Sequence, residues 1–438
     1  MNCVIQDIYI RCAERLVERG LAYRCFCTEE ELEDKRKSAK TKGKAVMYDG
    51  TWRDADPTEV QERLNAGNPF TIRFRVPEGA VITIDDLVRG KVTWDAEATV
   101  GDFVIMRSNG MPVYNFCVAV DDAKMKITHV LRAEEHLTNT LRQILVLNAL
   151  DYTAPIYAHV SLILGSDRSK LSKRHGAASV QQFREQGYLP SALINYLAKL
   201  GWNDGTDKEI YQPKEIIKVF DLNRIIPSPA VFDVDKLRWI NAQHIKLLPS
   251  SELQSLVAAA LKMSDSDSGF EIIPILGSQG GEEEAKFVEI ISDNARDKLD
   301  VITDARNFTL EILRYELMNT MRDDKTVMIF NNDIVSKLIS DYDEDNFPEG
   351  GNSDFPSAWK AYVKLLGKEL NLKGKELFQP LRLALTGRLS GPDVGEQLQT
   401  IFYAPNVIHP DARTIFVPLH ERIEILRFFM VNKIRKYV

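Results

Sequence analysis

The segment of residues 126–149 most constrains the fold, because a β-rich run passes directly into a helical one. "KITHVL" occupies positions 126–131, and the residues after it keep helical spacing through Leu137, Leu141, Ile144 and Leu145. A strand that feeds a helix is the unit of an open α/β sheet, whose ligands bind at the carboxyl ends of the strands. The polar residues at that end are Arg132, Glu134, Glu135 and His136.

Stretches on either side support a sheet in the first part of the chain. "FTIRFRV" (70–76) alternates apolar and polar residues, which predicts a half-buried strand. "DFVIMRSNGMPVYNFCVAVDD" (102–122) predicts two strands around Asn109-Gly110, a dipeptide typical of tight hairpin turns. An amphipathic helix is expected over residues 7–19, ended by Gly20, with no strand or cap before it.

From about residue 180 the pattern is helical. Helical spacing is clear in "SALINYLAKLGW" (191–202), "LEILRYEL" (310–317) and "ERIEILRFFMVNKI" (421–434). Stretches 262–284 and 340–354 are predicted to be linkers or loops, because they are rich in Gly, Ser, Asp and Glu. An α/β part followed by a helical part is therefore expected.

The bulk composition limits the class of protein. A length of 438 residues with 44% apolar content allows roughly two to four domains with real cores. The net charge of -7 does not exclude nucleic-acid binding, since a local basic surface is enough. No run approaches about eighteen apolar residues, so no membrane span is expected, and the first residues read as neither a secretory signal nor a transit peptide. Five cysteines, an odd and low count, indicate a reducing compartment.

The basic stretch "DRSKLSKRHGA" (167–177) is a candidate phosphate-binding loop. Lys170 and Lys173 lie three residues apart beside Ser172, and each could bind phosphate oxygens as a mobile point charge. Taken alone, such a string is more often a solvated basic loop. Its position after the apolar run "AHVSLIL" (158–164), in an α/β part, favours phosphate binding.

Two further residues have both a functional and a structural interpretation. Tyr114 could offer a hydroxyl to a ligand, or it could pack on the sheet as a hairpin aromatic residue. Arg132 could bind a carboxylate through its two-pronged guanidinium, or it could form a salt bridge with Glu134 or Glu135. His136 is interpreted as a structural histidine in the first helical turn.

Two other motifs have structural interpretations. Cys25-Phe26-Cys27 could be half of a metal site, but no Cys or His lies between residues 28 and 116, so a complete local zinc site is not expected. "QPLRLALTG" (379–387) is predicted to be a buried helix with Arg382 at its surface.

Segments along the whole chain together resemble the bacterial-type glutamyl-tRNA synthetases, a class I family. They are "AYRCFCTEEEL", "VYNFCVAVDDAKMKITHVLRAEEHLTNTLRQ", "RSKLSKRHGAASVQQFREQGYLPSALINYLAKLGW", "VFDVDKLRWINAQHI" and "PLRLALTGRLSGPDVG", in the family's order. The resemblance implies an α/β catalytic part, an incomplete class I Rossmann fold with an α+β insertion, followed by all-α stem-contact and anticodon-binding domains. It places the end of the first Rossmann half and the acceptor-binding insertion at 1–113, the second half at 114–178, the stem-contact domain at 179–250 and the anticodon-binding domain at 251–438.

The resemblance also implies roles for individual residues. Lys170, Lys173 and Arg174 would stabilise charge on the triphosphate of ATP, with Leu171, Ser172 and Glu135 also at the ATP site. Tyr114 and Arg132 match the family's glutamate-binding tyrosine and arginine. The implied substrates are L-glutamate, ATP with Mg²⁺, and tRNA(Glu), which is charged through a glutamyl-adenylate. A monomer is expected. A plastid or mitochondrial location is expected because the ungapped motifs are most similar to plant and algal organellar members, and the alternative is the cytoplasm.

Three features depart from the family pattern. No His-x-Gly-His motif is present, so the first half of the nucleotide fold is expected to lie before Met1 and the activity of the chain as given to be impaired. The region that completes zinc sites in some relatives reads Tyr48-Asp49-Gly50-Thr51-Trp52, so no zinc is predicted. Family members that charge only glutamate tRNA carry an arginine that tests the last anticodon base. The nearest match to that position here is Ala295, with Arg296 beside it, so the chain is predicted to charge tRNA(Gln) as well.

Two alternatives to a glutamate–tRNA ligase are considered. One is a non-catalytic protein that binds tRNA but does not activate glutamate. The other is a glutaminyl-tRNA synthetase, which reads the anticodon with β-barrels, and the helical spacing after residue 280 argues against it.

Overall fold

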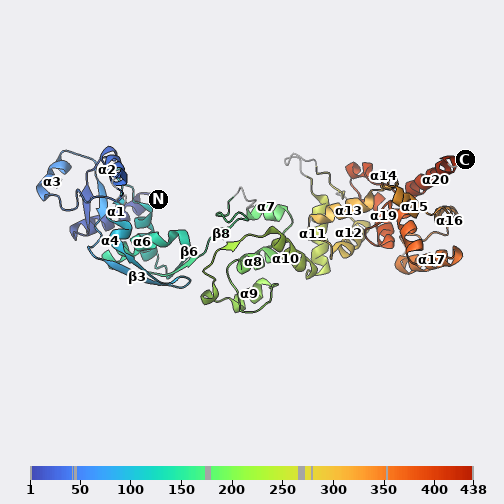
Figure 1. Ribbon diagram of the computed structural model, residues 1–438, viewed down its shortest axis with the longest axis horizontal. Coiled ribbons are helices and arrows are strands. Elements are labelled where there is room, and N and C mark those ends of the chain that lie inside the picture. Colours follow the sequence, from blue (N-terminus) through green and yellow to red (C-terminus); the bar gives the residue numbers. More distant parts are fainter. Residues whose placement is uncertain are drawn as a thin grey trace. The chain divides into compact units, whose positions relative to one another are not determined.

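The computed structural model describes residues 2–41, 43, 47–172, 179–264, 272–277, 280–351 and 354–436 (Figure 1). The chain divides into two compact units. The first unit comprises residues 1–175, 198–207 and 214–232, and the second comprises 176–197, 208–213 and 233–438. The lysine-rich loop continues into residues 173–178, so Lys173 and Arg174 lie outside the described residues.

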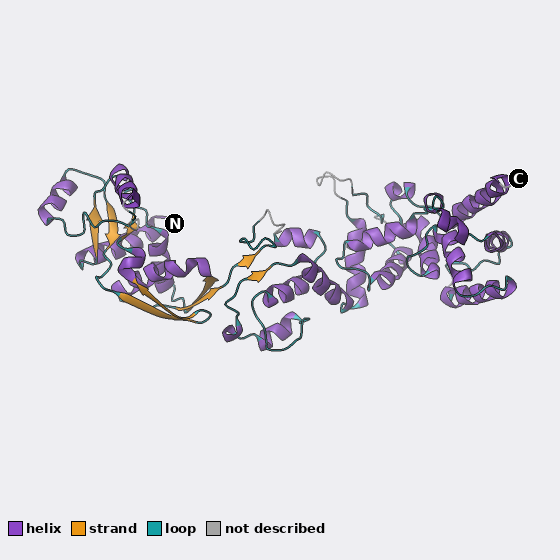
Figure 2. Cartoon of the chain, viewed as in Figure 1, coloured by secondary structure: helices purple, strands orange, loops and turns teal. Residues whose placement is uncertain are grey.

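The strands of the described chain all lie before residue 232, where helices and strands alternate (Figure 2). The elements of this part are α1 (Asn2–Glu18), β1 (Ala22–Cys25), α2 (Glu29–Thr41), α3 (Pro57–Asn65), β2 (Thr71–Phe74), β3 (Val81–Asp86), β4 (Gly90–Asp95), α4 (Ala96–Val100), β5 (Phe103–Met106), α5 (Tyr114–Lys124), β6 (His129–Ala133), the 3-10 turn η1 (Glu134–His136), α6 (Leu137–Ala149), β7 (Ile156–Val160), β8 (Ile163–Leu164), α9 (Pro213–Val219), η3 (Leu222–Arg224) and β9 (Ala230–Val231).

The remaining described elements are helices. They are α7 (Val180–Glu185), α8 (Pro190–Lys199), α10 (Val234–Lys246), α11 (Ser250–Lys262), α12 (Glu282–Ala295), α13 (Asp304–Leu313), α14 (Leu317–Thr320), α15 (Asp324–Ile329), α16 (Asn332–Asp343), α17 (Phe355–Glu369), α18 (Lys375–Thr386), α19 (Val394–Val407), η4 (Pro410–Thr414) and α20 (Leu419–Lys436). The predicted order of an α/β part followed by a helical part is confirmed. No described helix is long and apolar enough to cross a membrane.

Four small sheets position the chemistry of the first unit. Strands β1, β2 and β5 form an antiparallel sheet in that order, and β3 and β4 form a hairpin. Strands β6 and β7 pair in parallel and are connected by α6, so the predicted strand-to-helix unit is confirmed. Strands β8 and β9 form a short parallel pair.

The predicted second strand within 102–122 is wrong. The turn at Asn109-Gly110 forms, because the Gly110 N–H donates to the Arg107 carbonyl at 2.9 Å and Gly110 adopts a φ of 75°. The chain after it, however, is the helix α5, whose buried residues are Phe116, Ala119 and Val120. These residues are three and then one position apart, which places them on one helical face. The surrounding run is mostly apolar, so this helical spacing could not be recognised in the sequence.

The other predicted elements near the site agree with the structure. Helix α1 ends where expected, with Gly20 in the left-handed region at a φ of 69°, and β2 lies within 70–76. Leu16, Phe74, Ile105 and Phe116 are among the buried residues of the first unit's core. These contacts pack α1 and α5 against the β1-β2-β5 sheet.

In the second unit, a fully buried arginine joins helices far apart in the sequence. Arg422 of α20 donates to the carbonyls of Ile312 and Leu313 at 2.8 and 3.1 Å, at the carboxyl end of α13. It also donates to Leu385 near the end of α18 at 3.0 Å and to Val417 at 2.8 Å. Burial lowers the pKa of Arg422 to about 10, so it remains charged at neutral pH. A cation at these helix ends satisfies carbonyls that have no partner within their own helices.

Replacing Arg422 with Met is expected to destabilise the second unit by about 3 kcal/mol or more, because each buried acceptor left without a donor costs about 1–3 kcal/mol. Urea unfolding and hydrogen exchange at α13 and α20 would measure the change. Arg427→Met on the same helix is the control, since Arg427 forms ion pairs with Asp343 and Glu424 that are partly exposed. Equal effects of the two changes would contradict the assigned role.

Candidate active site

The candidate site lies at the carboxyl ends of β6 and β7. Parallel pairing places Arg132 of β6 opposite His159 of β7, and η1 follows β6 directly. Ligands of open α/β sheets bind at this edge. Arg132, Glu135 and Lys170 all belong to this part of the first unit.

Arg132 is half-buried and held by polar partners rather than by a carboxylate. Its Nε donates to Nε2 of His159 at 3.2 Å, and its Nη2 donates to Thr140 Oγ1 at 2.6 Å and to Gln143 Oε1 at 2.8 Å. Within the described part of the chain, Nη1 has no hydrogen-bond partner. Burial lowers the pKa of Arg132 below its usual value.

The structural interpretation of Arg132 as a salt-bridge partner of Glu134 or Glu135 is wrong. Glu134 instead forms an ion pair with Arg89, and Glu135 forms one with Lys170. Both glutamates turn away because they lie in η1, beyond the end of the strand that carries Arg132. The guanidinium therefore keeps one nitrogen for a ligand.

Tyr114 is the first residue of α5, and 55% of its surface is exposed. The interpretation of Tyr114 as a hairpin residue packed on the sheet is therefore wrong, because the segment is helical. Its phenol lies close enough to Arg132 to act on the pKa of the guanidinium. Tyr114 on α5 and Arg132 on β6 therefore lie in the same neighbourhood of the first unit.

Lys170 is bound to Glu135 at the start of the basic loop. Its Nζ lies 2.8 and 3.0 Å from the two carboxylate oxygens, and both side chains are substantially exposed. The loop backbone is fixed to β8, since Leu171 donates to the Ile163 carbonyl at 3.0 Å. The hydrogen bond from Lys170 holds the pKa of Glu135 below its usual value, so the pair persists at neutral pH and is lost as the pH falls through that lowered pKa.

His136 and Ser172 occupy less central positions. The His136 ring lies 3.1 Å from the side-chain nitrogen of Asn139 within the first turn of α6, in a position that suits the predicted structural role. Leu171 and Ser172 are half-buried beside β8. Lys173 and Arg174, two of the predicted ATP-binding residues, are outside the described residues.

Cys25 and Cys27 lie beside Tyr48 rather than beside further metal ligands. The Tyr48 hydroxyl is 3.4 Å from the Cys25 sulfur and 3.9 Å from the Cys27 sulfur. Burial acts to raise the pKa of the Cys25 thiol, but hydrogen bonds from Tyr48, the Cys27 backbone and Arg73 outweigh it and lower that pKa. Across the residues that the structure describes, no group of three or more His, Cys, Asp and Glu side chains could hold a metal ion.

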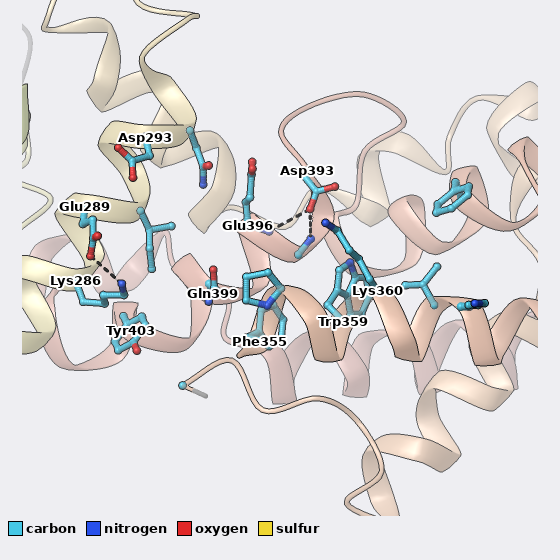
Figure 3. A pocket seen from close by; sticks show the side chains of 18 of the residues that line it. Lys286, Glu289, Asp293, Phe355, Trp359, Lys360, Asp393, Glu396, Gln399 and Tyr403 are labelled. Carbon is cyan, nitrogen blue, oxygen red and sulfur yellow. Dashed lines mark hydrogen bonds and ion pairs between the residues drawn. The ribbon is translucent and has the colours of Figure 1, made fainter. Parts of the chain in front are cut away.

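A cavity with a volume of about 1800 Å³ lies in the second unit (Figure 3). Helices α12, α17, α18 and α19 supply its wall, with Lys286 and Glu289 paired at 2.8 Å on α12. Asp393 accepts from Gly395 N at 2.8 Å and begins α19. The lining includes several lysines and aromatic residues, namely Lys286, Lys360, Lys364, Lys368, Lys373, Phe355, Trp359, Phe378 and Tyr403.

The predicted anticodon residues do not line this cavity. Ala295 is fully buried at the end of α12, and Arg296 donates to the Leu248 carbonyl at 2.7 Å and to Ser250 at 3.1 Å. Asp293 and Asn294, the two residues before them, do line the cavity. Successive side chains along α12 point about 100° apart, so Asp293 and Asn294 can face the cavity while Ala295 faces the core.

Sequence reasoning missed three residues that contact Arg132, namely His159, Thr140 and Gln143, and it missed Asp86, which contacts His159. Thr140 and Gln143 had a usable signal, because polar residues three apart on the apolar face of a helix are unusual. Asp86 and His159 had none, since 73 positions separate them and both occur in otherwise ordinary strands.

Two family profiles match the chain. One, described as tRNA synthetases class I (E and Q), catalytic domain, matches residues 5–239, and one described as anticodon binding domain matches residues 354–401. The Glutamate–tRNA ligase of Carboxydothermus hydrogenoformans is 41% identical over 393 residues, which cover 89% of this chain and 78% of that protein. The Glutamate–tRNA ligase of Aquifex aeolicus is 40% identical over 394 residues, with coverages of 88% and 78%.

Solved structures agree with these matches. The crystal structure of a glutamate tRNA ligase from Elizabethkingia meningosepticum, in complex with its amino acid, has a TM-score of 0.77 and 27% identity, covering 97% of this chain and 82% of that chain. The glutamate–tRNA synthetase of Elizabethkingia anophelis has a TM-score of 0.75. All these relatives are bacterial, so they give no support to the predicted plastid or mitochondrial origin.

Protein purified without chelator is expected to contain far less than one zinc per chain, because two thiols and a phenol do not complete a tetrahedral zinc site. Elemental analysis by mass spectrometry would measure the metal. The comparison is between Cys25→Ser and the control Cys117→Ser, which lies outside the cluster on α5. Stoichiometric zinc in the wild type that disappears only in Cys25→Ser would contradict the prediction.

Proposed function

We propose that this chain, which belongs to the glutamate–tRNA ligase family of class I aminoacyl-tRNA synthetases, attaches L-glutamate to tRNA(Glu) at the expense of ATP. In the first step the α-carboxylate of glutamate attacks the α-phosphorus of ATP, forming glutamyl-adenylate and releasing pyrophosphate. In the second, the 2′-hydroxyl of the terminal tRNA adenosine attacks the activated carbonyl and releases AMP.

The observation that carries this proposal is the partly anchored guanidinium of Arg132 at the strand end. Its Nε and Nη2 are held by His159, Thr140 and Gln143, while Nη1 is left for a ligand. A fixed guanidinium binds a carboxylate with strong, directional hydrogen bonds. Glutamate carries two carboxylates, and the nearby hydroxyl of Tyr114 supplies a neutral donor beside this cation.

Lys170 is proposed to bind the triphosphate of ATP. In the structure it is paired with Glu135, and both groups are exposed enough for a phosphate to displace the carboxylate. Lys173 and Arg174, with Leu171 and Ser172, would complete this side of the site, as the family resemblance implies. Cations placed where negative charge develops on departing pyrophosphate lower the barrier to its release.

Magnesium is proposed to arrive as the complex of ATP. Mg²⁺ commonly keeps several waters and is held by substrate phosphates with one or two carboxylates. The described residues around Lys170 fit that arrangement, because Glu135 offers a carboxylate that becomes available once Lys170 moves to phosphate. The ion would neutralise phosphate charge.

The second unit is proposed to bind the tRNA through the cavity between α12 and α17–α19. Lys360, Lys364 and Lys368 on α17 provide attraction for phosphates, and exposed Phe378 provides a ring for base stacking. We assign residues 1–113 and 114–178 to the catalytic part with its acceptor-binding insertion, 179–250 to stem contact and 251–438 to anticodon binding. The resemblance to the family and the profile match at 354–401 support this assignment.

We also propose that the chain charges tRNA(Gln) as well as tRNA(Glu). An arginine that tests an anticodon base must present its guanidinium to the nucleic acid. Ala295 has no such group, and the guanidinium of Arg296 is engaged with Leu248 and Ser250. No arginine side chain from this position therefore rejects the glutamine anticodon.

Replacing Arg132 with Gln is expected to reduce kcat/KM for glutamate by about 100-fold, because a charge-assisted contact to the substrate carboxylate is lost. Glutamate-dependent exchange of pyrophosphate into ATP, in the presence of tRNA(Glu), is the measurement. The control is Arg107→Gln, whose side chain is exposed in the turn after β5. Absence of exchange by the wild-type chain, with tRNA binding retained, would support the non-catalytic alternative instead.

Charging of purified tRNA(Gln) is expected to proceed with a kcat/KM within about tenfold of that for tRNA(Glu), since discrimination requires a group that penalises the wrong base. Acid-gel separation of charged and uncharged tRNA would measure both rates in one preparation. Efficient charging of tRNA(Glu) combined with strict rejection of tRNA(Gln) would contradict the proposal without affecting the ligase assignment.

A further inference from the structure

A fully buried Asp86–His159 pair lies directly behind Arg132. Asp86 ends β3, His159 lies on β7, and both side chains have no exposed surface. The Asp86 Oδ2 is 2.6 Å from His159 Nδ1. His159 Nε2, on the opposite side of the ring, is 3.2 Å from Arg132 Nε and 3.0 Å from Thr140 Oγ1.

The surroundings of Asp86 keep its carboxyl ionised. It accepts hydrogen bonds from the N–H groups of Val88, Arg89 and His159 at 3.0, 2.9 and 3.1 Å. Burial acts to raise the pKa of Asp86, but these hydrogen bonds and the His159 ring outweigh burial and lower that pKa. An ionised carboxylate only accepts, so the proton between the two side chains is on Nδ1 of His159.

The other ring nitrogen must then be an acceptor. The charged and titratable groups facing His159 are Asp86, Arg132 and His136, and burial lowers the pKa of the ring below its usual value in spite of Asp86. A neutral ring with its proton on Nδ1 has a lone pair on Nε2. Arg132 Nε is an obligatory donor, so only this tautomer can accept its hydrogen bond.

We infer that Asp86 and His159 are positioning residues, which fix the tautomer of His159 so that it accepts from Arg132 Nε and leaves Nη1 directed to the substrate. This inference rests on the proposed role of Arg132 in binding glutamate. A guanidinium is planar, so anchoring Nε and Nη2 fixes the direction of Nη1. Asp86 at the end of β3 thus acts through the His159 ring on β7 to orient Arg132 on β6.

The test needs a substitution that keeps the structural contacts of Asp86 and changes only its contact to the His159 ring. Asp86 also holds the turn that follows β3, where Leu87 N donates to the Tyr157 carbonyl at 2.9 Å and Arg89 Nε donates to the His159 carbonyl at 3.2 Å. An asparagine at position 86 keeps the oxygen that accepts from Val88 and Arg89. It replaces Oδ2 with an amide that donates, which forces the proton of His159 onto Nε2, facing the Arg132 donor.

The first test is the tautomer in Asp86→Asn. Nitrogen NMR of the protein labelled in its histidine rings is expected to show one neutral ring with its proton on Nδ1 in the wild type, and its assignment comes from loss of the signal in His159→Gln. In Asp86→Asn the proton is expected on Nε2. Asp85→Asn is the matched control, since Asp85 is the exposed neighbour on the same strand, and it should leave the signal unchanged. An unchanged tautomer in folded Asp86→Asn would overturn the inference.

The second test separates positioning from folding. Asp86→Asn is expected to raise KM for glutamate by about 10- to 100-fold, because misplacing a binding group by about 1 Å has effects of that size, while KM for ATP stays near the wild-type value. Equal rises in both values, or no rise, would overturn the inference. If Asp86→Asn does not fold, His159→Phe, which removes the acceptor for Arg132 Nε, takes its place with the same expected split between the two KM values.

The tautomer measurement needs no substrate, so the two proposals can fail separately. A wild-type chain with the Nδ1 proton but no glutamate-dependent exchange would overturn the proposed function and leave the Asp86–His159–Arg132 arrangement established. A wild-type chain that is active but carries the proton on Nε2 would overturn the inference alone.

Discussion

The parallel pairing of β6 with β7 is the constraint on which the first unit's site depends. The register sets Arg132 opposite His159, so their side chains leave the same face of the pair. The connecting helix α6 then presents Thr140 and Gln143, three residues apart and therefore on one helical face. A slip of one residue in β6 would move Arg132 to the other face, away from all these partners, and a slip in β7 would remove His159 from Arg132.

Both units bury charged groups, and they stabilise them by different means. Asp86 is an anion surrounded by backbone N–H groups and one imidazole, whereas Arg422 is a cation surrounded by backbone carbonyls. Among the residues that the structure describes, neither is paired with a buried group of opposite formal charge. Backbone dipoles are already fixed by secondary structure, so they stabilise a charge without the entropy cost of ordering a second long side chain.

The order of the α/β part and the helical part could be predicted from the sequence. So could the site residues that lie in local motifs. Strand β6, helix α6 and the polar residues between them follow from one continuous pattern, as does the nearness of Lys170 to β8. The helix beginning at Tyr114 was missed because an apolar run after an Asn-Gly turn suits a strand as well as a helix, and burial on one side decided between them. The partners of Arg132 could not be derived, because Asp86 and His159 meet only through the tertiary packing of a hairpin on a different sheet.

The anchoring of α13 by Arg422 has a consequence for the order in which the chain can fold during synthesis. The contact between Arg422 and Ile312 spans 110 positions, so the ribosome must add that many residues after Ile312 before its donor exists. Until then the carbonyls of Ile312 and Leu385 lack this donor, so those helix ends must stay hydrated. The contacts from α20 to the ends of α13 and α18 therefore form late, after both of those helices have been synthesised.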